Sequence, residues 1–173
     1  SFARPFDFTA EDTNVRELVE DLVDTFRVRP ENKHIKFRLD CQISSGKQAV
    51  MDSLLIKQAL VNLVENAINA FESRPGEISL GITERSDSVI ISVQDFGCGI
   101  TEENLGKIFT PFFSSRPSGT GLGLPLAKKI IDLQQGRLTV SSEPGKGTVF
   151  NIVLPLNCSA SDPRGDEKTY QTV

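Results

Sequence analysis

The sequence has little of what zinc sites, disulfide scaffolds and membrane spans are made from. Its 173 residues include one histidine and three cysteines, Cys41, Cys98 and Cys158, at spacings that show no pairing. Such scattered residues do not match a zinc site, and an odd cysteine count is typical of a reducing compartment. No apolar run approaches the roughly 18–20 residues of a membrane helix. We therefore expect a cytoplasmic location and no membrane contact by this chain.

The sequence also has fewer basic than acidic residues. Nineteen Lys and Arg stand against 23 Asp and Glu, the net charge is −4, and the basic residues form no stripe. We therefore expect no nucleic-acid partner. The chain does have 38% apolar and 24% charged residues, which are values of a globular protein. Its length fits one domain with a hydrophobic core.

Hydrophobic periodicity predicts the organisation of the chain. We expect a linker over residues 1–11, a folded domain over 12–156 and a disordered polar tail over 157–173. The apolar spacing predicts helices over 13–27, 53–72 and 125–135, and strands over 35–39, 49–51, 77–83, 88–94, 137–142 and 148–154. This order lacks the regular alternation of a parallel sheet. It predicts an α+β fold with helices layered on one face of a mixed sheet.

Local signals set the expected helix ends. Asp12 or Thr13 is predicted to cap the first helix, Pro75-Gly76 to end the second and Gly136 to end the third. The segment over 100–118 has no sustained period and is rich in Gly, Ser and Pro. It is predicted to be a long loop with one helical turn, and such a loop inside a compact domain is usually functional.

A polar stripe runs along the otherwise apolar helix predicted over 53–72. It consists of Gln58, Asn62, Glu65, Asn66 and Asn69, which fall within an arc of about 100° at 3.6 residues per turn. Asparagine is a poor helix former, and buried amides need partners that a ligand or metal could supply. An amide oxygen is a suitable ligand for Mg²⁺. An exposed stripe without function is the alternative interpretation.

Two glycine clusters flank the long loop. The first, Asp95-Phe96-Gly97-Cys98-Gly99, follows an apolar strand, where a carboxylate can accept a hydrogen bond from the exocyclic amine of a base. The second, Gly119-Thr120-Gly121-Leu122-Gly123-Leu124, leads into a helix whose unpaired N–H groups can hold phosphates. Taken singly, each is also compatible with an ordinary turn or flexible loop. Together they indicate a nucleotide site.

These segments resemble the motifs of the GHKL ATPase superfamily in order and spacing. The N box resembles Asn62-Leu63-Val64-Glu65-Asn66-Ala67, and the glycine clusters are similar to the G1 and G2 boxes. The F box resembles Ile108-Phe109-Thr110-Pro111-Phe112-Phe113, and Gly145 to Phe150 is similar to the closing Gly-Thr element. The resemblance is to the catalytic domain of bacterial sensor histidine kinases, in particular the nitrogen- and dicarboxylate-sensing branch. It implies a Bergerat fold, a two-layer α+β sandwich in which three helices back about five strands, with a mobile lid over ATP.

The resemblance also implies roles for individual residues. Asn66 would coordinate Mg²⁺ with help from Asn62, Asp95 would bind the adenine amine, and Arg116 would reach the γ-phosphate. The further nucleotide-binding residues would be Asn69, Gly97, Gly99, Ile100, Phe109, Gly119, Thr120, Gly121, Leu122, Gly123, Leu124 and Thr148. Two positions depart from the pattern, because the family usually has a small polar residue at Phe96 and many sensor kinases have lysine at Asn69.

Phosphoryl transfer is favoured over ATP hydrolysis. The hydrolysing members of the superfamily have a glutamate general base where this chain has Asn62, and an amide cannot accept a proton from water. The only histidine, His34, begins a predicted strand, so the resemblance implies a phosphoacceptor histidine on an upstream dimerisation domain. It further implies a homodimer in the full-length protein and a response regulator receiver domain as partner. The alternative is a nucleotide-binding module, such as an anti-sigma-factor-like kinase or a degenerate nucleotide sensor.

Overall fold

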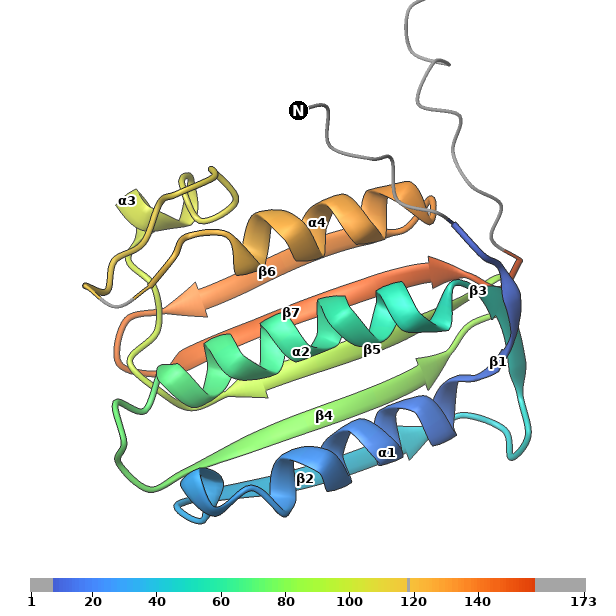
Figure 1. Cartoon of the computed structure of the whole chain (residues 1–173), viewed down its shortest axis with the longest axis horizontal. Helices are drawn as coiled ribbons and strands as arrows, with labels where there is room; N and C mark the ends of the chain where they lie inside the picture. The colour runs from blue at the N-terminus through green and yellow to red at the C-terminus, as the bar shows by residue number, and fades with distance from the viewer. Residues whose placement is uncertain (1–7, 118, 158–173) are drawn as a thin grey trace, which may run out of the picture.

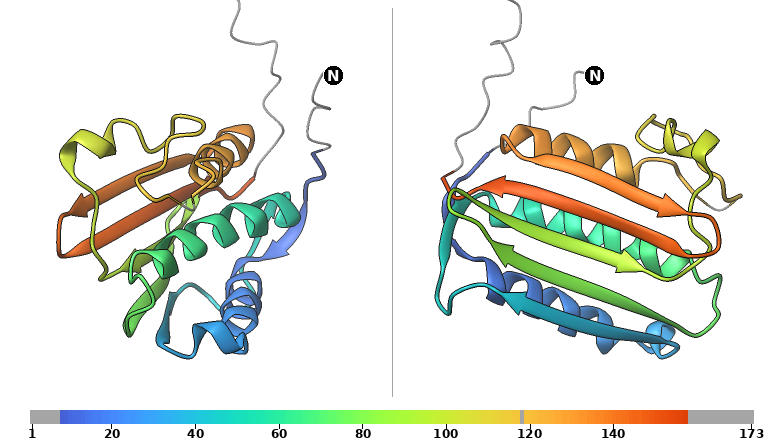
Figure 2. Two further views of the ribbon diagram at one scale, coloured as in Figure 1. Left: turned by 60° about the vertical axis from the view of Figure 1, so that its left-hand side comes forward. Right: turned by 180° about the vertical axis from the view of Figure 1, so that it is seen from behind.

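The computed structural model describes residues 8–117 and 119–157. These residues form two layers, a mixed β-sheet and a set of helices on one of its faces (Figure 1). Seen from behind, the strands of the sheet lie in front of the helices (Figure 2). The tail expected over 157–173 lies outside the described residues except for Asn157. In the part of the chain described, no helix has the length and apolarity needed to cross a membrane.

The main sheet has five strands in the order β2-β4-β5-β7-β6, in which only β2 and β4 pair in parallel. β1 and β3 form a separate antiparallel ribbon. The elements in chain order are β1 (Glu11–Asn14), α1 (Val15–Arg27), η1 (Pro30–Asn32), β2 (Ile35–Gln42), β3 (Gln48–Met51), α2 (Ser53–Asn69), β4 (Gly76–Glu84), β5 (Ser88–Asp95), α3 (Glu102–Leu105), α4 (Gly123–Leu133), β6 (Arg137–Glu143) and β7 (Gly147–Pro155). The predicted α+β sandwich, with five strands backed by three helices, is confirmed.

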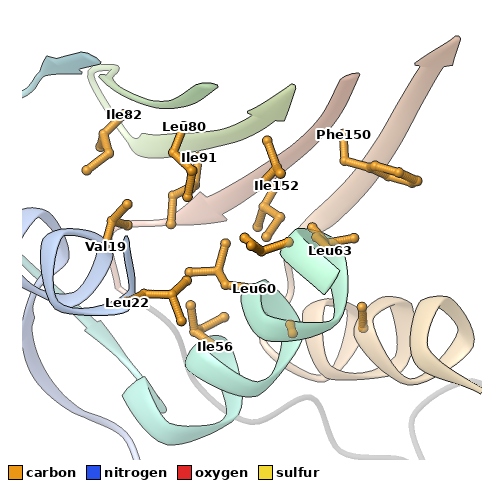
Figure 3. Packing of buried hydrophobic residues seen from close by; sticks show 14 of the residues in the cluster. Val19, Leu22, Ile56, Leu60, Leu63, Leu80, Ile82, Ile91, Phe150 and Ile152 are labelled. Atoms are coloured by element: carbon orange, nitrogen blue, oxygen red, sulfur yellow. The ribbon is translucent and has the colours of Figure 1, made fainter. Parts of the chain in front are cut away.

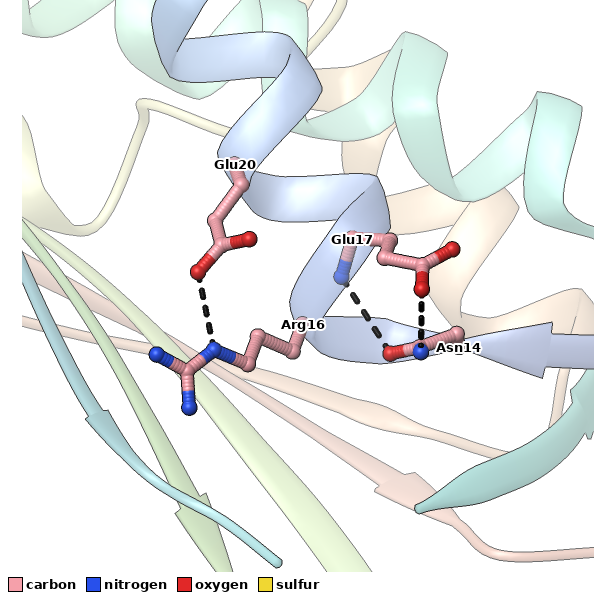
Figure 4. Close-up of polar contacts among 4 residues, drawn as sticks. All are labelled: Asn14, Arg16, Glu17 and Glu20. Atoms are coloured by element: carbon pink, nitrogen blue, oxygen red, sulfur yellow. Dashed lines mark hydrogen bonds and ion pairs between the residues drawn. The ribbon is translucent and has the colours of Figure 1, made fainter. Parts of the chain in front are cut away.

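Helix α1 is capped by Asn14, and the predicted cap at Asp12 or Thr13 is wrong. Asn14 Oδ1 accepts a hydrogen bond from the Glu17 N–H at 3.3 Å, while Asn14 Nδ2 donates to Glu17 Oε1 at 2.8 Å (Figure 4). Arg16 pairs with Glu20 one turn on. Asp12 and Thr13 belong to β1 instead, since they pair with β3. This short polar strand depends on a partner almost forty residues away and lies in part within the expected linker.

The hydrophobic core lies between the sheet and helices α1, α2 and α4. Ile56, Leu60 and Leu63 of α2 have no exposed surface, and neither have Ile91 of β5 and Ile152 of β7, which point from the sheet toward the helices (Figure 3). Burying one side chain of this size contributes about 1.5–3 kcal/mol. The apolar faces of the predicted helices therefore form the core as expected, and they hold α2 firmly against the centre of the sheet.

The bounds of α2 and α4, the two helices that form the site, differ from the predicted ones. Helix α2 ends at Asn69 rather than residue 72, because Glu72 and Ser73 take positive φ values of 50° and 67°. Helix α4 begins at Gly123, two residues before the predicted start at Pro125. At its other end Gln135, not Gly136, adopts the left-handed conformation, with φ of 56°.

A buried polar junction joins the start of α2 to the end of α4. The Asp52 N–H donates to Gln134 Oε1 at 2.9 Å, and Gln134 Nε2 donates to the Asp52 carbonyl at 3.3 Å. The Asp52 carboxylate caps α2 by accepting from the Leu55 N–H and also accepts from the Thr9 N–H. Because the two helices run in opposite directions, their other ends, the C-terminal half of α2 and the start of α4, also lie together.

Candidate functional site

A cavity of about 520 Å³ lies between the C-terminal half of α2 and the start of α4, beside α3. This volume is within the range of pockets that bind small molecules and cofactors. The cavity is at the opposite end of α2 and α4 from the Asp52–Gln134 junction, the end toward which α3 lies in Figure 1. It is therefore built on two helices whose separation is fixed by the core and by a buried pair of hydrogen bonds.

One wall of the cavity is the polar face of α2. It is lined by Asn62, Glu65, Asn66 and Asn69, whereas Gln58, the first residue of the predicted stripe, lies outside it. Their spacing of three and four residues places them on one side of the helix. The Nδ2 atom of Asn62 is buried and has no hydrogen-bond partner among the described residues. Since buried polar groups are normally paired, this atom is suited to meet a ligand.

The opposite wall is the glycine-rich segment that enters α4. Residues Gly119 to Leu124 line the cavity, and the first turn of α4 presents N–H groups and the positive end of the helix dipole there. A Cβ added to Gly123 would lie 3.5 Å from Asn62 Oδ1, so the two walls are in close approach. Such a helix end binds anions, phosphates in particular.

Gly121 permits this segment to pass close to the loop before it. Its φ is 69°, and an added Cβ would lie 2.4 Å from the carbonyl carbon of Phe112. The Phe112 N–H donates to the Gly121 carbonyl at 2.9 Å. A side chain at position 121 would be strained and would also force the two segments apart.

Asp95 ends β5 beside Thr148, which lines the cavity, and is only 2% exposed. Its Oδ1 accepts a hydrogen bond from the Gly97 N–H at 2.9 Å. Burial raises the pKa of the Asp95 carboxyl, and the Gly97 and Thr148 N–H groups and the Arg116 guanidinium oppose this rise by less. Asp95 lines a neighbouring hollow of about 300 Å³ rather than the main cavity, and Thr148 lines both.

The segment between the glycine clusters covers part of the cavity. Thr101 and Asn104 line it from the region of α3, and Ser114, Ser115 and Arg116 line it from the turn further on. Phe112, in the same segment, does not line the cavity and is 79% exposed. The mobility expected of this lid stays a prediction.

The structure brings most of the predicted site residues around one cavity. The exceptions are Asp95, Gly97 and Phe109: Asp95 lines the neighbouring hollow, Gly97 lies against Ala70, and Phe109 packs against the hydrophobic core. The residues brought together are Asn62, Asn66, Asn69, Gly99, Ile100, Arg116, Gly119, Thr120, Gly121, Leu122, Gly123, Leu124 and Thr148. Phe96, which departs from the family pattern, is half-exposed and does not line the cavity.

Some lining residues were absent from the predicted set. Glu65 belongs to the polar stripe, so its helical position was a usable signal. Glu72 and Cys98 line the cavity beside the end of α2, and Asn104 lines it from α3. No periodic or motif signal marked Glu72 and Asn104, because their positions depend on how the chain turns after each helix or strand.

Comparison with known proteins gives matches along most of the chain. Residues 51–157 match the family described as histidine kinase-, DNA gyrase B- and HSP90-like ATPase. Signal transduction histidine-protein kinase AtoS of Escherichia coli K12 is 38% identical over 170 residues, covering 96% of this chain and 26% of AtoS. Sporulation kinase E of Bacillus subtilis 168 is 34% identical over 168 residues, covering 95% of this chain and 22% of that kinase. The chain thus spans about a quarter of these relatives.

Solved structures show the same similarity. The catalytic domain of histidine kinase ThkA superposes with a TM-score of 0.77 at 31% identity, covering 86% of this chain and 97% of that one. ThkA in complex with the response regulator protein TrrA gives a TM-score of 0.73 at 30% identity, covering 86% of this chain and 42% of the ThkA chain.

Proposed function

The chain belongs to the histidine kinase-, DNA gyrase B- and HSP90-like ATPase family, in which it is a sensor histidine kinase catalytic domain, and we propose that it binds Mg-ATP between α2 and α4. It would hold the γ-phosphate for transfer to a histidine of a separate domain. The carrying observation is that the amide face of α2 and the N-terminus of α4 enclose one cavity.

The residues on these walls fit a nucleotide phosphate chain with its cation. Asn62 has a buried, unpartnered Nδ2 donor among the described residues, and it adjoins Gly123 at the start of α4. The N–H groups of that helix end would bind phosphate oxygens. The amide oxygen of Asn66 suits Mg²⁺, which commonly binds few protein groups together with phosphates and waters. When bound, the cation would neutralise charge on the phosphates.

Asp95 would bind the base beside Thr148, its partner across β5 and β7. An adenine amine would donate to its ionised carboxylate, which already accepts from the Gly97 N–H. That interaction favours the charged form and would lower the pKa that burial raises. The same carboxylate is therefore unfavourably buried without nucleotide and is stabilised when the amine is present.

The side chains around the cavity favour phosphoryl transfer over hydrolysis. Asn62 occupies the wall at the family position of the general base and cannot take a proton from water. Glu65, the acidic residue on the same wall, has its carboxylate 3.8 Å from the Arg29 guanidinium. Positioning and charge neutralisation provide most of the catalysis in phosphoryl transfer, and these are what amides, N–H groups and Arg116 can supply.

The accepting histidine would come from an upstream dimerisation domain. His34, the one histidine of the chain, precedes β2 and does not line the cavity. In the full-length protein we infer a homodimer located in the cytoplasm, with a response regulator receiver domain as the next phosphate acceptor. The structure of ThkA with the response regulator TrrA supports a partner of this kind.

Incubation with ATP labelled at the γ-phosphate tests this assignment. We expect the chain to bind the nucleotide and to retain no stably attached phosphate, because it holds no histidine at the cavity. The His34→Gln variant is the matched control and should behave in the same way. Phosphate incorporation that His34→Gln abolishes would show that the accepting histidine lies within the chain, contrary to the proposal.

A further inference from the structure

We propose that Ser114 is a positioning residue, whose hydroxyl fixes the backbone of Arg116 so that the guanidinium stays at the cavity and meets the terminal phosphate of bound nucleotide. This rests on the proposed binding of ATP. It adds a residue outside the motif positions and gives the turn after the F box a defined task.

The Ser114 hydroxyl bonds both backbone groups of Arg116. Ser114 Oγ accepts a hydrogen bond from the Arg116 N–H at 3.1 Å and donates to the Arg116 carbonyl at 2.9 Å. One hydroxyl is thereby used as donor and acceptor at once, which is its full donor capacity. The turn cannot rotate about Arg116 without losing both bonds.

Because Gly119 has no side chain, the Ser114 hydroxyl can occupy the space beside it. A Cβ added to Gly119 would lie 2.1 Å from Ser114 Oγ, a distance that atoms in contact do not reach. The Gly119 N–H also donates to the Arg116 carbonyl at 3.1 Å. The Arg116 carbonyl therefore accepts from both Ser114 and Gly119, and the first phosphate-binding glycine of the α4 wall is tied to the arginine.

The Arg116 side chain lies at the cavity and is available to bind a ligand. It is half-buried and lines the same cavity as Asn62 and Asn66, and its field reaches the Asp95 carboxylate. It forms no ion pair with any residue of the described ranges. Fixing a residue on binding costs backbone as well as side-chain entropy, so a backbone that is already held lowers the cost of binding.

The test compares the affinities of the chain for Mg-ATP and Mg-ADP by calorimetry, since only ATP carries the terminal phosphate. We expect Arg116→Gln to lose the preference for ATP. Ser114→Ala, which removes both bonds of this exposed hydroxyl, should weaken ATP binding about two- to tenfold, with ADP binding unchanged. Ser114→Thr, which keeps the hydroxyl, should retain the wild-type preference for ATP over ADP. Ser86→Ala, in the turn between β4 and β5, is the control for loss of a hydroxyl elsewhere.

The double variant separates positioning from general damage. Because Ser114 acts through Arg116, adding Ser114→Ala to Arg116→Gln should change ATP affinity no further. Wild-type ATP affinity in Ser114→Ala, or equal losses for ATP and ADP, would overturn the role of Ser114. Wild-type behaviour of Arg116→Gln would overturn the inference as well. Failure of the wild-type chain to bind either nucleotide would instead contradict the proposed function.

Discussion

Replacement of Asp95 by asparagine should weaken nucleotide binding and remove a specific pH dependence of stability. The side chain is 2% exposed, and its carboxylate accepts from the Gly97 N–H. Asparagine keeps an acceptor for Gly97 but has no charge to offer an adenine amine. A hydrogen bond to a charged group contributes about 1.5–3 kcal/mol, so we expect a roughly 10- to 150-fold higher Kd for ATP.

The effect on stability has a definite sign. Because burial raises the pKa of Asp95 in the folded protein, its contribution to stability is greatest below the unfolded pKa and falls as pH rises. Because asparagine does not ionise, the variant does not lose stability in this way. The free energy of unfolding of the variant, relative to wild type, should therefore increase from pH 4 to pH 7. Each unit of pKa difference corresponds to about 1.4 kcal/mol.

Chemical denaturation without nucleotide at several pH values, together with ATP titration at pH 7, measures both effects. The exposed Asp87→Asn substitution, in the turn before β5, is the matched control. A stability difference that stays constant or shrinks as pH rises would refute the reasoning about burial. An unchanged Kd would refute the assignment of Asp95 to the base.

Two further predictions concern other parts of the fold. Gln134→Leu should lower the free energy of unfolding by about 1–3 kcal/mol, because it leaves the buried Asp52 N–H without its partner; denaturant titration measures this, and an unchanged stability would contradict it. The Lys47 side chain, 2.7 Å away, and the Ser44 N–H and hydroxyl together lower the pKa of Glu84 to about 2, so the stabilisation is present above about pH 4.5 and is lost as pH falls toward 2. The difference in melting temperature between wild type and Glu84→Gln should therefore shrink over this interval, and a difference as large at pH 2 as at pH 5 would contradict the assignment.

The sequence predicted those elements whose own residues determine them. Helices α1 and α2 follow from apolar residues at helical spacing, and the two hairpins follow from alternation and turn residues. Strand β1 could not be found in this way, since Glu11–Asn14 is short and polar and is a strand only through β3. The early end of α2 likewise depends on the left-handed turn at Glu72 and Ser73, residues with no strong preference for it.

The site shows the same difference between features set by local sequence and features set by distant parts of the chain. The amides of α2 could be placed on one face because helical spacing fixes their directions, and they line the cavity together. The burial of Asp95 beside Thr148 could not be predicted, because it depends on the pairing of β5 with β7. The bonds between Ser114 and Arg116 are set by a turn without periodicity, so only the folded chain reveals them.

Titration of Mg-ATP into the wild-type chain and into Asn66→Ala by calorimetry tests most directly that the cavity between α2 and α4 binds nucleotide. Asn66 is half-buried on the α2 wall, where its amide oxygen would meet the cation. We expect binding by the wild-type chain and none detectable by the variant, with both equally folded. Unchanged affinity in Asn66→Ala would contradict the placing of the phosphates and their cation in this cavity.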